Sequence, residues 1–402
     1  MDPCMGGTSQ AIRTCIKGLS ALGDKNEVVT LDPPDAAFLG CDPFPIYALG
    51  AFKNPWSFSP TLIPWLVDNL PRFDAVIIHG LWLFHGFALL RAMQQVAANG
   101  SGVGNSSNPL VYVMPHGMLD PYFQKDSSRK LKAIRNNFYW KWIESHVIGK
   151  ADGLLFTCED ERVLAQKTFT PYQPKKELVV GLGVDEPPAF TPKMKEAFLL
   201  TCPLPADSSY LLFLSRLHPK KGLEELIRAY AASSHLALPP LVIAGPHDSP
   251  YAEEMVELAR RLCPPNSVFF PGMLTGDAKW GAFYGSEIFI LPSHQENFGI
   301  AIVEAMACGK PVMITRKVNI WQEIAVENGG LIFSDTHEQI CDMLEQWQQI
   351  PAHKRAEMEQ GARLAYQKNF TIDASARRLQ QALAKKQATA CDSKLPAFSS
   401  CH

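Results

Sequence analysis

Short apolar runs rich in β-branched residues alternate with amphipathic stretches along almost the whole chain. In the first half the runs are EVVTL (27–31), AVIIHG (75–80), LVYVM (110–114), GLLFTC (153–158) and ELVVGLG (177–183). In the second half they are YLLFLSRL (210–217), LVIAG (241–245), SVFFPG (267–272), EIFILPS (287–293), PVMIT (311–315) and GLIF (330–333). This alternation is typical of a parallel sheet covered by helices on both faces. We therefore expect an α/β protein.

A proline-rich stretch without helical or strand periodicity, residues 189–205, separates the two sets of runs. Because 402 residues suffice for two domains of ordinary size, we predict two Rossmann-like domains that face each other across a deep cleft. They would span residues 1–188 and 206–368, with 189–205 as the linker. Residues 369–388 are expected to form a C-terminal helix that packs back on the first domain, and residues 389–402 a disordered tail.

Composition excludes several classes of protein. Hydrophobic residues make up 47% of the chain and charged residues 19%, which argues for a globular protein and against disorder. The formal charge of -2 gives no support to a nucleic-acid partner. The ten cysteines are scattered, without a C-x-x-C pair or a histidine at zinc spacing, so we expect reduced thiols, no metal site and a cytoplasmic location. No apolar run approaches the ~20 residues that span a bilayer.

The stretch HQENFGIAIVEAMACGKP (294–311) places two carboxylates beside an apolar segment directly after a strand-like run. We predict a helix from about Phe298 to Cys308 with Asn297 as its N-cap. Glu296 would precede that helix and Glu304 would lie inside it, both near one ligand. A plainer interpretation is that Glu296 complements the dipole of the helix and that Glu304 is a partly exposed helical residue, with neither binding a ligand. The backbone N–H groups expected to meet phosphate or sugar oxygens are those of Phe298, Gly299 and Ile300.

The run FLSRLHPKKG places Arg216 at a strand end and Lys221 immediately before a glycine. An arginine fork and a lysine charge that converge there suit a pyrophosphate, although a solvated surface pair is the alternative. Lys220 is expected to be a bystander. The chain contains no Asp-x-Asp to hold a metal ion, so the two cations favour a site that needs neither a metal nor a cofactor.

The runs SRLHPKKG, LVIAGP and ENFGIAIVE, in this order and spacing, resemble the retaining nucleotide-sugar glycosyltransferases of the type B fold (GT-B), the group 1 or family 4-like glycosyltransferases. HGLWLFHG (79–86) and MPHGMLDPYF (114–123) look like the acceptor-domain loops of the same family. The resemblance covers nearly the whole chain except the linker and the tail.

This resemblance implies roles for the donor-binding residues. Glu304 would accept hydrogen bonds from the ribose, and Glu296 from the transferred sugar. Arg216 and Lys221 would bind the diphosphate, while His116 would lie near the anomeric carbon. Further donor contacts are implied for Gly6 and Gly7, which would approach the diphosphate from the opposite domain, and for Gly245, which would leave room beside the nucleotide.

The sequence signals for acceptor-binding residues are weaker than those for donor-binding residues. His79 and Asp120 are candidates for acceptor contacts, yet His79 also fits a structural histidine and Asp120 an ordinary turn residue before proline. The basic, aromatic segment 125–150 suits an anionic membrane surface that carries a lipid-linked acceptor, or else an aromatic face packed into the core.

The family implies transfer of a hexose-type sugar from a UDP-, GDP- or ADP-linked donor to a glycan or lipid-linked acceptor, in polysaccharide, exopolysaccharide or lipopolysaccharide biosynthesis. The acceptor would enter on the face that the nucleotide leaves, so configuration is retained. A double displacement through Glu296 is the alternative mechanism. Two other functions stay open: a phosphorylase of the same fold, and a catalytically silent sugar-nucleotide binder or scaffold of an assembly complex.

One departure from the family concerns the first strand. The glycine loop MDPCMGG should follow a buried central strand, and the sequence begins at that loop. Without such a strand, two neighbouring strands of the first sheet would be unpaired.

Overall fold

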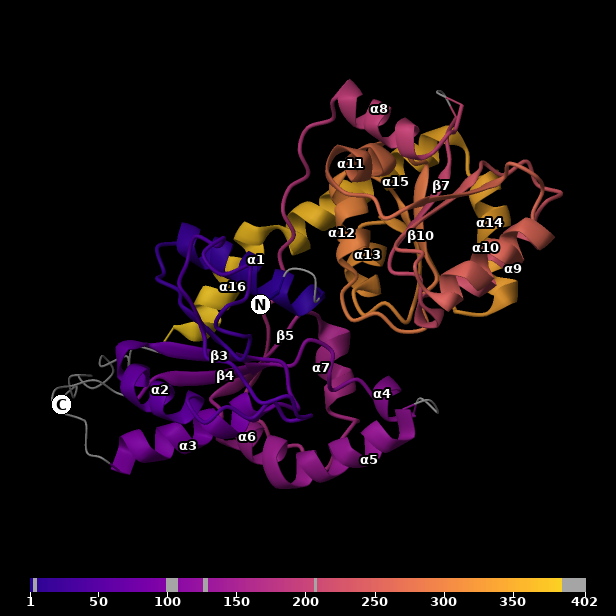
Figure 1. Ribbon diagram of the computed structural model, residues 1–402. Coiled ribbons are helices and arrows are strands. Elements are labelled where there is room, and N and C mark those ends of the chain that lie inside the picture. Colours follow the sequence, from indigo (N-terminus) through magenta and orange to yellow (C-terminus); the bar gives the residue numbers. More distant parts are fainter. Residues whose placement is uncertain (3–5, 99–107, 126–128, 206–207, 385–402) are drawn as a thin grey trace, which may run out of the picture.

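The computed structural model describes residues 1–2, 6–98, 108–125, 129–205 and 208–384. The tail expected over 389–402 and residues 126–128 of the basic segment lie outside this description. Figure 1 shows two α/β lobes. The first lobe comprises α1 to β6 together with the last helix, and the second lobe comprises α8 to η6.

All strand pairs in both lobes are parallel, as expected for helix-covered sheets. The second lobe holds a six-stranded sheet of order β12-β11-β10-β7-β8-β9. Its strands are β7 (Leu211–Leu214), β8 (Leu241–Ala244), β9 (Val268–Gly272), β10 (Ile288–Leu291), β11 (Val312–Thr315) and β12 (Gly330–Phe333). Every residue of β8, β10 and β11 is buried, because helices cover the sheet on both faces.

The first lobe holds a four-stranded sheet of order β3-β4-β5-β6 and a separate pair, β1-β2. These strands are β1 (Val28–Thr30), β2 (Ile46–Ala48), β3 (Ala75–His79), β4 (Leu110–Met114), β5 (Gly153–Phe156) and β6 (Glu177–Val179). Each apolar run of the sequence contains a strand, so the predicted α/β class is confirmed, and β2 is the strand that the patterns missed. Among the described residues, β1 pairs with β2 alone and does not join β3.

The helices of the first lobe follow the strands in the expected alternation. They are α1 (Gly7–Ala21), α2 (Leu62–Asn69), η2 (Leu70–Arg72), α3 (Phe84–Ala98), α4 (Tyr122–Lys125), α5 (Lys130–Tyr139), the π-helical segment η4 (Trp140–Glu144), α6 (Ser145–Lys150) and α7 (Glu159–Ala165). None of the described helices of the chain has the length and apolar character that crossing a bilayer requires.

The helices of the second lobe include a short 3-10 turn at the site described below. They are α8 (Pro192–Thr201), η5 (Pro219–Lys221), α9 (Leu223–Ala232), α10 (Pro250–Leu262), α11 (Gly276–Gly285), α12 (Ile300–Ala307), α13 (Trp321–Val326), α14 (His337–Gln349), α15 (Ala352–Ala365) and the π-helical segment η6 (Tyr366–Phe370). The chain then continues into α16 (Ile372–Leu383).

The expectation of an unpatterned linker over 189–205 is wrong in its central part, which forms α8. Pro192 begins that helix, where a missing N–H costs nothing. Met194 and Phe198 are buried, and a Cβ on Gly281 of α11 would lie 2.0 Å from the Met194 carbonyl oxygen. The close contact with α11 makes α8 part of the second lobe, which leaves only the residues before it as a connection.

Helix α16 returns from the second lobe to the first and lies along α1 (Figure 1). Gly18 of α1 permits this contact, because a Cβ there would lie 2.5 Å from the Cβ of Ala376. The hydroxyl of Tyr112, on β4, also donates to the carbonyl of Ala382 at 2.7 Å. The two lobes are therefore joined by two chain crossings, one before α8 and one at α16.

Candidate functional site

A cavity of about 520 Å³ lies between the two lobes. Six of its lining residues come from the first lobe: Gly7, Thr8, Ala11, His116, Thr157 and Leu182. The second lobe lines it at the carboxyl ends of its strands, with Leu214, Ser215, Arg216, Lys221, Gly245, Pro246, Met273, Leu274, Lys279, Leu291, Glu296, Asn297, Phe298, Gly299, Ile300 and Ala301. Ligands of open α/β sheets bind at this edge, so the cavity is the candidate site.

The loop after β10 brings a carboxylate and a helix N-terminus to the cavity. Glu296 is held by the loop after β11, because its N–H donates to Lys317 O at 2.9 Å and its carbonyl accepts from Asn319 N at 2.9 Å. Helix α12 begins at Ile300, and Gly299 at φ 76° is its N-cap. The first N–H groups of such a helix have no partner within it, so they are available to anionic oxygens of a ligand.

The prediction that Asn297 is the N-cap is wrong. Its side-chain amide instead donates to Thr157 Oγ1 of the first lobe at 3.1 Å and accepts from Asn319 at 3.2 Å. A Cβ on Gly117, which has φ 76°, would lie 2.7 Å from the Cβ of Asn297, so only glycine fits there. Asn297 therefore joins the lobes.

Two cations reach the cavity from the turn after β7. Gly222 has φ 67°, and a Cβ there would lie 2.1 Å from the carbonyl oxygen of Pro292. This close approach brings Lys221 against the loop after β10, where its Nζ contacts Oε2 of Glu296. Lys221 is 9% exposed, whereas Arg216 at the end of β7 is exposed and lines the same cavity.

Glu304 does not line the cavity itself. It lies one turn inside α12, and its Oε1 accepts from Lys279 Nζ at 2.8 Å. Lys279, on α11, does line the cavity. Sequence reasoning missed Lys279, because a lysine in the helical stretch GDAKWGAFYG has the appearance of an ordinary surface cation.

Lys220 has more contacts than its expected role as a bystander implied. Its Nζ donates to Gln295 Oε1 at 2.7 Å, and Gln295 Nε2 donates to Asp120 Oδ2 of the first lobe at 2.9 Å. Burial lowers the pKa of Lys220, and the charges of Lys221 and Arg216 lower it further, against the opposing effect of Glu296. Lys220 therefore connects the turn after β7 to the first lobe through Gln295.

Asp120, a predicted acceptor contact, does not line the cavity and is 7% exposed. Its Oδ1 accepts from Tyr122 N at 2.8 Å, which is the turn geometry expected of an aspartate before proline, and its Oδ2 accepts from Gln295. Both carboxylate oxygens therefore have protein partners.

His116 lines the cavity, and His79, the other predicted acceptor contact, lies behind it. His79 Nδ1 and His116 Nε2 are 2.9 Å apart in stacked rings whose centroids are separated by 5.2 Å. Burial lowers the pKa of His116 to about 4, and burial together with the neighbouring histidines lowers that of His79. At neutral pH both imidazoles are uncharged, so one ring donates to the other.

Glu161 supports this wall of the cavity and was not found by sequence reasoning. It is 3% exposed, and its carboxylate accepts from Gly117 N at 2.5 Å and from both the N–H and the hydroxyl of Thr157 at 2.8 and 2.6 Å. Burial raises its pKa. The signal was present in the acidic helix start EDER, but the pattern does not distinguish the buried carboxylate from its exposed neighbours.

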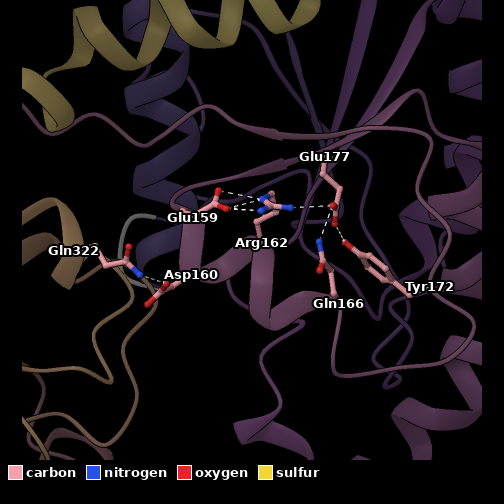
Figure 2. Close-up of polar contacts among 7 residues, drawn as sticks. All are labelled: Glu159, Asp160, Arg162, Gln166, Tyr172, Glu177 and Gln322. Carbon is pink, nitrogen blue, oxygen red and sulfur yellow. Dashed lines mark hydrogen bonds and ion pairs between the residues drawn. The ribbon is translucent and has the colours of Figure 1, made fainter.

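Figure 2 shows those neighbours on α7. Arg162 bridges Glu159 and Glu177, with Arg162 Nε 3.0 Å from Glu159 Oε2 and Arg162 Nη1 3.3 Å from Glu177 Oε2. Asp160 points the other way and accepts from Gln322 at 2.7 Å and from Trp321 Nε1 at 2.8 Å, both on the second lobe. The three consecutive acids of α7 therefore have different roles. Glu159 makes contacts within the first lobe, Asp160 joins the two lobes, and Glu161 supports the cavity wall.

The predicted glycines divide into two groups. Gly7 begins α1 and lines the cavity, whereas Gly6 precedes the helix with φ 104° and does not line it. Gly245 lines the cavity, and a Cβ there would lie 2.0 Å from Ser215 O, so it permits the close packing of two strand ends. Among the predicted site residues, Gly6, Glu304, His79 and Asp120 thus lie outside the cavity lining, and the others form it.

The two lobes match two described protein families. Residues 6–183 match the Glycosyl transferase 4-like domain, and residues 202–365 match Glycosyl transferases group 1. Together these ranges contain every residue that lines the cavity.

Among curated proteins, the chain is 31% identical to D-inositol 3-phosphate glycosyltransferase 2 of Catenulispora acidiphila over 201 residues, which cover 47% of this chain and 46% of that protein. It is 28% identical over 242 residues to D-inositol 3-phosphate glycosyltransferase of Mycolicibacterium smegmatis, covering 58% and 53%. The matched regions thus span about half the length of these relatives.

Solved structures resemble the whole fold. HepE of Anabaena, in complex with UDP and glucose, matches with a TM-score of 0.69 and 17% identity over 94% of this chain and 96% of that chain. Sucrose-phosphate synthase of Thermosynechococcus elongatus matches with a TM-score of 0.67 and 19% identity over 94% and 92%. These similarities establish a shared two-lobe fold.

Proposed function

Because this chain belongs to the group 1, family 4-like glycosyltransferases, we propose that it is a retaining, metal-independent hexosyltransferase. It transfers the sugar of a nucleotide-diphosphate donor to a glycan or lipid-linked acceptor in polysaccharide, exopolysaccharide or lipopolysaccharide biosynthesis. The observation that carries this proposal is the cavity between the lobes, where Arg216, Lys221 and Glu296 meet the N-termini of α1 and α12.

In this proposal the donor diphosphate lies between cations and helix ends. Arg216 and Lys221 bind it from the second lobe, and the N-terminus of α1 at Gly7 meets it from the first, as helix N-termini favour anions. The ribose binds to Glu304, which Lys279 positions at 2.8 Å. Glu296 and the N–H groups at the start of α12 bind hydroxyls of the transferred sugar.

The chemical step breaks the bond between the anomeric carbon and the diphosphate oxygen, and the electron pair leaves with the oxygen. Negative charge therefore grows on the diphosphate, which Arg216 and Lys221 stabilise. The acceptor hydroxyl enters from the same face, forms the new bond to the anomeric carbon and gives its proton to the departing phosphate oxygen. This sequence retains configuration.

The contact between Lys221 and Glu296 supports this route over a double displacement. A carboxylate that is paired with an ammonium is a weaker nucleophile than a free one, because its charge is already neutralised. His116 is uncharged with a pKa of about 4, so it serves as a hydrogen-bonding group beside the sugar and not as a cation.

The chain has no Asp-x-Asp sequence, and Arg216 and Lys221, which line the cavity, offer the positive charge that a metal ion would otherwise provide at the diphosphate. Metal independence and the lack of any cofactor are part of the proposal for this reason. We also propose a cytoplasmic location, which the unpaired thiols of the seven described cysteines support.

The test begins with thermal unfolding in the presence of UDP-, GDP- and ADP-sugars. A ligand at 100 times its Kd stabilises the folded protein by about 2.7 kcal/mol, so the preferred donor raises the melting temperature. UDP-glucose is the first donor to test, because a solved structure of HepE, which has a similar fold, contains it. D-inositol 3-phosphate is the first acceptor to test, because it appears in the name of a curated relative.

Slow release of the nucleotide from the stabilising donor, faster with an acceptor and unaffected by a chelator, would support the transferase. Stabilisation by a donor without release in the presence of any acceptor would instead identify a silent binder. Lys221→Ala is the matched control, because it removes the proposed stabilisation of the leaving group.

A further inference from the structure

A row of large apolar side chains is exposed to solvent along α5 and η4 of the first lobe. Leu131 is 84% exposed, Ile134 56%, Phe138 63% and Trp142 70%. Their spacing of three or four residues places them on one face of the helix, since each residue advances by about 100°. We call these four residues the α5 stripe. Such a continuous apolar row on a surface helix marks a binding surface.

Positive charge flanks the α5 stripe on both sides. Lys130, Lys132, Arg135 and Lys141 are exposed, and the described segment 129–143 contains no acidic residue. The next carboxylate, Glu144, is 1% exposed and accepts from Trp82 N within the lobe. Within the described segment 129–143, the surface therefore combines exposed apolar side chains with exposed cations and no carboxylate.

The opposite face of the helix is packed firmly. Trp140 is 1% exposed, its ring is stacked on Phe169 with centroids 4.8 Å apart, and its Nε1 donates to Pro171 O at 2.8 Å. Ala133 and Asn136 are buried on the same face. The aromatic residues of this segment therefore divide, with Trp140 facing the core and Phe138 and Trp142 facing solvent. The outward orientation of the stripe is set by this packing.

The start of the helix is connected to the interlobe site through a chain of contacts. The guanidinium of Arg129 lies 4.7 Å from the ring centroid of Phe123, and Lys220 Nζ lies 5.5 Å from the same centroid on the second lobe. Lys220 in turn binds Gln295, next to Glu296. In Figure 1, α4 and α5 lie next to each other at the edge of the first lobe.

We propose that the α5 stripe and its cations bind the surface of an anionic phospholipid bilayer. The apolar side chains enter the boundary between headgroups and acyl chains, and the cations contact lipid phosphates, as in other interfacial helices. A second copy of this chain is a poor occupant, because a symmetric interface would place cations opposite cations. The docking does not depend on catalysis, but its consequence, delivery of a lipid-linked acceptor to the cavity, rests on the proposed function.

The test is flotation of the full chain with vesicles of phosphatidylcholine alone or mixed equally with phosphatidylglycerol. We expect binding to the mixed vesicles only, weakened at about 1 M salt, where the Debye length falls to about 3 Å. Replacing Lys132 and Arg135 by Gln should weaken binding roughly fivefold per cation. Leu131→Ser with Phe138→Ser should weaken it about tenfold or more, since each side chain loses apolar burial.

Matched controls lie on α8 of the second lobe. Leu200 is 88% exposed, close to the 84% of Leu131, so Leu200→Ser tests the loss of an exposed leucine elsewhere. Lys193→Gln tests the loss of an exposed positive charge elsewhere on the protein. Both should bind vesicles as the unchanged protein does, and Lys221→Ala should also bind, which separates docking from turnover.

Equal binding to neutral and mixed vesicles, or no binding to either, would overturn the proposal. Vesicle binding that is unchanged by the substitutions in the α5 stripe and by those of Lys132 and Arg135 would also overturn the proposal. A dimer in sedimentation that dissociates on Leu131→Ser with Phe138→Ser, without vesicle binding, would identify a second copy as the occupant.

Discussion

Lys221 Nζ contacts Glu296 Oε2, and the two side chains are only 11% and 15% exposed. The pair joins the turn after β7 to the loop after β10, which is the junction where the proposed diphosphate and sugar sites meet. A partly desolvated ion pair at this point holds both groups in place before the donor enters, so reorganisation at the chemical step is small.

The first prediction concerns the cations. Lys221→Ala and Arg216→Ala should lower kcat roughly 10²- to 10³-fold with a smaller change in KM, because the charge they meet grows in the transition state. Steady-state kinetics with the donor found by thermal unfolding measures this. Lys193→Ala on α8 is the control for loss of a lysine, and equal small effects from all three variants would contradict the assigned roles.

The second prediction concerns the ribose contact. Glu304→Ala should raise the Kd of the donor about tenfold, or about 1.4 kcal/mol, with little change in kcat. Lys279→Met should act in the same direction, since it releases the carboxylate that Lys279 positions. Calorimetric titration of the nucleotide diphosphate measures both. A loss confined to kcat would show that Glu304 contacts the reacting groups and not the nucleotide.

The third prediction concerns the bridge between the lobes. Asp120→Ala leaves the buried Nε2 of Gln295 without its acceptor at 2.9 Å, so the free energy of unfolding should fall by about 1–3 kcal/mol. Urea unfolding measures the loss. Asp277→Ala, an acid in the first turn of α11, is the control. A stability equal to that of the control would show that water replaces the missing acceptor.

The fourth prediction concerns Glu144, whose pKa burial raises to about 7 from 4.5. A carboxyl with a raised pKa in the folded state contributes stability that is fully present below pH 4.5 and is lost as the pH rises through about 7. The shift corresponds to about 3 kcal/mol. Glu144→Gln should remove this dependence between pH 4.5 and 7 in urea unfolding, whereas Glu357→Gln, exposed on α15, should keep it.

The fifth prediction concerns His294, just before Glu296. Its ring contacts Glu225 at 3.4 Å and Asp335 at 3.0 Å, and these carboxylates raise its pKa to about 9 from 6.5. Stability from the charged ring is therefore present below pH 6.5 and lost as the pH rises through 9.

We expect that loss to be about 1–2 kcal/mol, since the side chain is 27% exposed and solvent screens part of the interaction. His294→Gln should flatten the dependence of the unfolding free energy on pH over this range, and His235→Gln, exposed in the turn after α9, should not. An unchanged slope in His294→Gln would assign the loss to other groups.

Much of the fold followed from local patterns. The apolar runs predicted β1 and the strands from β3 to β12, because residues buried on both faces of a parallel sheet must be apolar along the whole strand. Strand β2 was missed, since IYA lies between prolines and glycine and is too short for a pattern. Helix α8 was missed because prolines near both of its ends resemble those of a linker.

The site was only partly predictable. Arg216, Lys221 and Glu296 stand at strand ends, and the carboxyl ends of parallel strands share one edge, so their convergence could be expected. Lys279, Gln295 and Glu161 carry no comparable signal, because their partners are distant in the sequence: Gln295 and Asp120 are 175 positions apart.

By itself, the sequence determined the α/β class, the positions of most strands and the edge at which charged groups gather, since each depends on burial and backbone preference within a few residues. Only the tertiary structure decided which carboxylate is buried, which cation has a partner and which aromatic residues of α5 face solvent. Those outcomes depend on which distant segments come together, and on the desolvation and pairing of each charge once they have done so.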